Sequence, residues 1–170
     1  MKPYFADAER RKQLIAELEL WLGTPFQRQE PGQMPEKKVS GGCNNTLCVI
    51  LAAVGALALD EYLPLCEQPF SPADPSSSLR QQSALNRLVY SGAATEIPVV
   101  QEQAKAVVDS PEMAGDLLLF RQTTGMQALG INAGERVCYC MTSARGFVKL
   151  ARSQCGMFGQ LIRIVRINTP

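Results

Sequence analysis

Hydrophobic residues in the first half of the chain recur every three or four positions, which predicts helices. The first expected helix covers residues 7–22, where charged residues separate a set of apolar side chains: Leu14, Ile15, Leu18, Trp21 and Leu22. Residues 44–54 have the same spacing and are apolar almost all round, so we expect a core helix that stops at Gly55. Further helices are predicted over residues 79–90 and 99–108.

The second half of the chain changes period and predicts short strands. Apolar and β-branched runs alternate with glycine or polar turns, as in hairpin-connected strands. These runs are residues 116–120, 128–132, 136–141, 146–150 and 160–167. Helices followed by strands indicate an α+β fold, with the helices packed on an antiparallel sheet of about five strands.

Two polar segments connect the helices. Residues 24–42 form a loop rich in proline, glycine and charge, and a loop of this length in a compact domain is usually functional or mobile. Residues 67–78 form a second proline-rich stretch. Neither side of that stretch contains enough apolar residues for its own core, so we expect a single domain over residues 1–170.

The charge balance is nearly neutral and suggests no polyanionic partner. The chain has 17 Lys and Arg residues against 16 Asp and Glu residues, without a run of like charges, so no nucleic acid partner is expected. The charged N-terminus lacks the features of a secretory signal, and the longest apolar run, residues 49–59, is about half of the ~20 residues that a membrane span requires. We therefore expect a cytoplasmic protein without a membrane segment.

The six cysteines contain no C-x-x-C pair, and the chain has no histidine. The usual Cys/His zinc sets cannot be assembled from these residues, and we expect no metal or other cofactor. In a reducing compartment, free cysteines commonly behave as small buried apolar residues. We expect this of every cysteine except Cys43.

Cys43 is the candidate reactive residue. It follows two glycines and begins the second expected helix, where free backbone N–H groups and the helix dipole favour a thiolate. A small residue in a tight turn is the alternative interpretation.

The order of motifs around Cys43 resembles the NlpC family of papain-fold cysteine peptidases. A helix, the sequence Trp-Leu-Gly-Thr-Pro-Phe at 21–26, a loop, a cysteine at a helix start, and Gly-Asp-Leu-Leu-Leu-Phe-Arg at 115–121 follow in the family's order. The resemblance implies a papain-like fold and relatives that cleave peptide bonds in bacterial peptidoglycan. Phage-encoded members of the family accompany tail or lysis functions.

The chain departs from the family pattern at three positions. Gly42 stands where the family usually has Asp before its nucleophile. The family histidine corresponds to Ala128, within a stretch that keeps the following Leu-Gly-Ile, and a shift of one residue would place Gln127 there instead. The third polar position corresponds to Cys140. Asn45 is an alternative register for the nucleophile, but it misplaces Gly55, so Cys43 is preferred.

Without a histidine, the proton transfers of a Cys-His enzyme have no carrier. Asp116 or another carboxylate is a poor acid for an amine leaving group at pH 7. The sequence therefore predicts an inactive homologue that binds a peptide, a peptidoglycan fragment or a phage-type assembly protein, with Phe26 and Gln127 as candidate binding residues. Trp21 is expected in the core.

Three alternatives remain open. In the first, Cys43 is a nucleophile for thioesters or activated esters, whose leaving groups need no proton. In the second, Cys43 and Cys140 form a redox pair, since Ala128 leaves room between them. In the third, the domain is purely structural, and side chains fill its cleft.

Overall fold

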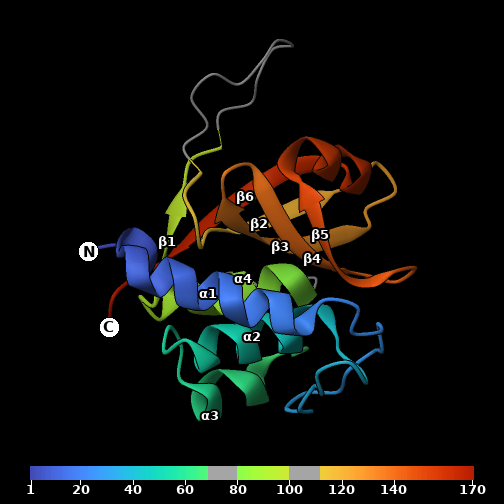
Figure 1. The fold of residues 1–170 in the computed structure, drawn as a ribbon, viewed down its shortest axis with the longest axis horizontal. Coiled ribbons are helices and arrows are strands. Elements are labelled where there is room, and N and C mark those ends of the chain that lie inside the picture. The colour runs from blue at the N-terminus through green and yellow to red at the C-terminus, as the bar shows by residue number, and fades with distance from the viewer. Residues whose placement is uncertain (69–79, 100–111) are drawn as a thin grey trace.

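The computed structural model describes residues 1–68, 80–99 and 112–170. It confirms the α+β class: the α-helices lie on one side of an antiparallel sheet (Figure 1). The helix expected over residues 99–108 and most of the polar stretch at 67–78 lie outside the described residues.

The three longer helices follow the predicted spacing. They are α1 (Ala8–Trp21), α2 (Cys43–Ala53) and α4 (Arg80–Tyr90). The Asp7 side chain accepts a hydrogen bond from the Arg10 backbone N–H at 3.0 Å, which caps α1. Gly23 and Gly55 follow α1 and α2 with φ of 79° and 74°, a left-handed conformation that favours glycine and ends both helices.

Four short helical segments did not show in the sequence pattern, because each is too brief for a periodic signal. They are η1 (Tyr4–Ala6), α3 (Leu59–Tyr62), η2 (Leu63–Leu65) and η3 (Arg152–Phe158).

All five predicted strands are present in the sheet. They are β2 (Leu117–Arg121), β3 (Gln127–Gly134), β4 (Val137–Thr142), β5 (Gly146–Ala151) and β6 (Gln160–Ile167). A sixth strand, β1 (Ala94–Ile97), joins the edge beside β6 and gives the order β1-β6-β2-β3-β4-β5. The described residues thus form the expected antiparallel sheet of about five strands with one further strand at its edge. β1 has only four residues and two exposed side chains, so it lacks a clear alternation.

The sheet separates two apolar clusters. The larger one joins α1, α2 and α4 to the helix-facing side of the sheet, through residues such as Leu18, Ile50 and Leu129. The smaller one lies on the opposite side, where Cys155 of η3 packs with Phe120 and Cys138. The core thus extends through both faces of the sheet.

The segment at residues 24–42 is tied to the rest of the protein at both ends. Gly23 N–H donates to the Phe147 carbonyl at 2.9 Å, and Phe147 N–H donates to the Thr24 carbonyl at 2.9 Å. Near its other end, Gly41 N–H donates to the Pro25 carbonyl at 3.0 Å, and Gln27 N–H donates to the Gly41 carbonyl at 2.9 Å. The segment therefore folds back on itself and returns the chain to the start of α2.

A buried ion pair connects the start of β2 to β6. The Asp116 carboxylate is fully buried, and it accepts hydrogen bonds at 2.8 Å from both Nε and Nη2 of Arg166. The Met113 backbone N–H donates to the same carboxylate at 2.7 Å. A buried charge without its partner is costly, so this pair holds the two strands together.

Replacing Arg166 tests this connection. Arg166→Ala leaves the Asp116 carboxylate buried without a cation, and we expect the free energy of unfolding to fall by about 3–5 kcal/mol, measured by urea titration. Lys12→Ala is the matched control, since it removes one partner of an exposed pair with Glu9 and should cause no measurable loss. Equal losses in the two variants would contradict the structural importance of the buried pair.

Candidate functional site

Cys43 is the first residue of α2, and the two glycines before it allow a close backbone approach. A Cβ atom on Gly41 would lie 2.4 Å from Thr46 Oγ1, and one on Gly42 would lie 2.5 Å from Gln29 Cγ. Larger residues cannot occupy either position without displacing these neighbours. The glycines therefore let residues 24–42 pack against the first turn of α2.

The Cys43 thiol is a hydrogen-bond donor to the sheet. Its Sγ lies 3.5 Å from the Leu129 carbonyl oxygen of β3, an arrangement that requires the protonated thiol. Burial raises the pKa of Cys43 to about 11, and the nearby Glu67 carboxylate acts in the same direction. The position at a helix start favours a thiolate, as the sequence indicated, whereas burial of the thiol acts in the opposite direction.

Positions 127 and 128 lie on opposite faces of β3. Leu129 and Ile131 pack in the cluster that contains α2, so strand alternation places Gln127 on that face and Ala128 on the other. Both amide atoms of the Gln127 side chain are buried without a hydrogen-bond partner among the described residues. Neither side chain at these two positions is able to serve as a base at neutral pH.

Cys140 belongs to β4, opposite Gly130 of β3, and its side chain packs in the smaller apolar cluster with Cys138. Burial raises the pKa of Cys140 to about 12, and the Cys43 thiol adds to this effect, so the two thiols are within electrostatic range. Cys43 itself packs against the larger cluster. The structure thus places the two cysteines of the considered redox pair against different clusters.

Trp21 and Phe26 lie near the start of the segment that leads to Cys43, and their surroundings differ. Phe26 is 44% exposed, and its backbone forms a bridge with Gly41. Trp21 is buried as expected, and its Nε1 donates to the Glu17 carboxylate at 2.9 Å. Of these two aromatic side chains, Phe26 is therefore the one available to a partner.

Asp116 does not serve the thiol. Its two carboxylate oxygens are occupied by Arg166 and by the Met113 backbone N–H, as described above. Asp116 is thus a structural residue rather than a proton carrier for Cys43.

Two polar residues near Cys43 were missed in the sequence. Glu67 accepts a hydrogen bond at 2.9 Å from Nδ2 of Asn44, the residue after Cys43. Gln29 is 1% exposed, lies against Gly42, and has no hydrogen-bond partner for its amide within the described ranges. Both come from irregular polar segments without periodicity, so no sequence signal marked them.

The described residues contain no group of three or more His, Cys, Asp or Glu side chains that is arranged to hold a metal ion. Among the helices of the described part of the chain, none combines the length and the apolar character of a membrane span.

Comparison with known proteins identifies the fold. No protein-family model matches the sequence, and no curated protein matches it either. A solved structure from Staphylococcus aureus, described as similar to a lipoprotein of the NLP/P60 family, aligns with a TM-score of 0.52 and 17% sequence identity. The alignment covers 99% of this chain and 44% of that one, so this chain spans less than half the length of that protein.

At this level of identity the similarity concerns the fold. It agrees with the helices and the antiparallel sheet that the structure places together. The chain thus has the papain-like α+β fold found in an NLP/P60 protein.

Proposed function

We propose that this protein is an inactive NlpC-like domain that binds a peptide or a peptidoglycan fragment without cleaving it. The observation that carries the proposal is the state of Cys43 in a chain without histidine. Its thiol donates a hydrogen bond to the Leu129 carbonyl, and burial raises its pKa to about 11.

The chemistry of amide cleavage explains why this state matters. With a pKa near 11, only about one thiol in ten thousand is ionised at pH 7. The leaving amine also needs a proton donor, which an imidazole supplies in a Cys-His enzyme. Gln127 and Ala128 supply neither function, and loss of one such group commonly costs several orders of magnitude in rate.

The segment before Cys43 supports a binding role. It carries three exposed apolar side chains, Phe26, Met34 and Val39, with exposures of 44%, 54% and 57%. Aromatic side chains held on an ordered backbone often contribute much of the binding energy at an interface. A peptide or a stem-peptide portion of peptidoglycan fits this surface by its mixed apolar and polar chemistry. A protein of a phage-type assembly is the other partner class for the same surface.

Alkylation of Cys43 tests the state of the thiol. Because its pKa is about two units above that of an ordinary cysteine, iodoacetamide at pH 7 should label Cys43 at least about 100-fold more slowly than a free thiol. Labelling is followed by mass spectrometry of peptides, and the same protein in concentrated urea is the control in which all thiols react. Fast labelling of Cys43 at pH 6–7 would instead support the alternative of a nucleophile for activated acyl groups.

Co-sedimentation with purified peptidoglycan tests the binding role. We expect the protein to sediment with the polymer, to release no soluble peptides, and to bind equally after Cys43→Ala. Phe26→Ala should weaken binding by about fivefold or more, while Leu20→Ala, an exposed residue of α1, should leave it unchanged. Peptide release that disappears in Cys43→Ala would overturn the proposal, and so would a failure of the protein to sediment.

A further inference from the structure

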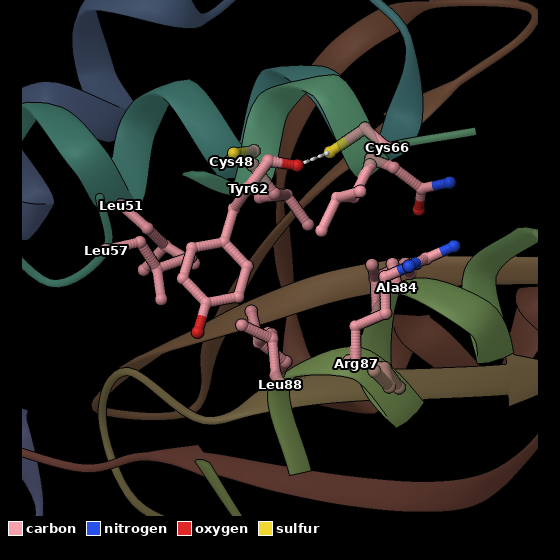
Figure 2. A pocket seen from close by; sticks show the side chains of 14 residues that line it. Cys48, Leu51, Leu57, Tyr62, Cys66, Ala84, Arg87 and Leu88 are labelled. Atoms are coloured by element: carbon pink, nitrogen blue, oxygen red, sulfur yellow. Dashed lines mark hydrogen bonds between the residues drawn. The ribbon is translucent and has the colours of Figure 1, made fainter. Parts of the chain in front are cut away.

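Two further cysteines, neither of them part of the Cys43 site, meet where α2 contacts the segment after η2. Cys48 belongs to α2, and Cys66 is the C-terminal cap of η2. Both are buried, and they form a small apolar cluster with Leu63. Cys66 Sγ donates a hydrogen bond to the Tyr62 carbonyl at 3.5 Å (Figure 2).

The two side chains pack together in this cluster and line the same cavity. The neighbouring Cys48 thiol, together with burial, raises the pKa of Cys66. Both cysteines are free thiols in this structure. Two cysteines that pack in one small cluster are candidates for a disulfide.

A cavity gives a small reagent access to this pair. It has a volume of about 40 Å³, and Cys48 and Cys66 are part of its wall. Figure 2 shows them on one side, with Leu88 and Arg87 on the other. One water molecule needs roughly 10–15 Å³ of such space, so a neutral molecule the size of hydrogen peroxide fits. Most of the remaining wall is apolar, including Leu51 and Leu57.

The second close pair of thiols has different surroundings. Cys138 of β4 and Cys155 of η3 also contact each other, but both side chains are 0% exposed within the smaller apolar cluster. Cys48 and Cys66 are 5% and 6% exposed and line a cavity. Access from the cavity therefore distinguishes the Cys48–Cys66 pair from the Cys138–Cys155 pair.

We propose that Cys48 and Cys66 are a site of reversible oxidation, at which a hydroperoxide converts the two thiols into a disulfide that joins α2 to the segment after η2. Glu67 directly follows Cys66, and it accepts a hydrogen bond from Asn44, which lies one turn before Cys48 in α2. The cross-link therefore lies next to this contact. Oxidation thus fixes the Glu67 carboxylate beside the start of α2.

The reaction balances in two steps. The Cys48 thiolate attacks one peroxide oxygen, so that an S–O bond forms as the O–O bond breaks, and the departing hydroxide takes the Cys48 proton as water. The Cys66 sulfur then attacks the Cys48 sulfenic acid. An S–S bond forms, the S–O bond breaks, and the released hydroxide takes the Cys66 proton as a second water. Two thiols are oxidised and one peroxide is reduced.

Peptide mapping of the peroxide-treated protein tests the proposal. We expect a loss of two hydrogen atoms per chain and a cross-linked peptide that contains Cys48 and Cys66, both reversed by dithiothreitol. Closing a loop of about 20 residues should also raise the melting temperature by about 6–12 °C. Cys43→Ala is the matched control that retains the pair and should behave like the unmodified protein.

Cys66→Ser should abolish both the mass loss and the rise in melting temperature. Mapping of the unmodified chain decides the question even if this variant folds poorly. The proposal is wrong if peroxide cross-links another pair first, or if Cys48 and Cys66 remain reduced while other cysteines are oxidised.

Discussion

The close approach of residues 24–42 to the first turn of α2 is the constraint on which the site depends. Gly41 and Gly42 have no side chains, so Thr46 and Gln29 occupy the space beside them. The helix that begins there carries the Cys43 thiol, which donates a hydrogen bond to the Leu129 carbonyl of β3. Packing at this one place therefore determines the backbone geometry of the helix start that presents the thiol to the sheet.

That packing separates two properties that a reactive cysteine normally combines. Position at a helix N-terminus favours the thiolate, and enclosure disfavours it. In this protein burial raises the pKa of Cys43, and the Glu67 carboxylate adds to this effect. A fold found in an NLP/P60 protein thus holds a cysteine at a helix start in a neutral state.

The sequence predicted those parts of the fold that have a long, regular pattern. The spacing of Leu14 and Leu18 gave α1, and the alternation around Leu129 and Ile131 gave β3. The four-residue β1 escaped prediction because its place depends on hydrogen bonds to β6, which is distant in the chain. Likewise, the pKa of Cys43 depends on burial by remote segments, and no local pattern encodes that.

The segment that leads to Cys43 also protects the sheet. β5 is an edge strand in the strand order, and its Phe147 exchanges backbone hydrogen bonds with Gly23 and Thr24. A Cβ atom on Gly146 would lie 2.2 Å from the Thr24 carbonyl oxygen, so glycine permits this contact. Exposed edge strands pair readily with other chains. Movement of this segment away from the sheet would therefore disturb the start of α2 and, in the same step, expose an edge at which two molecules could aggregate.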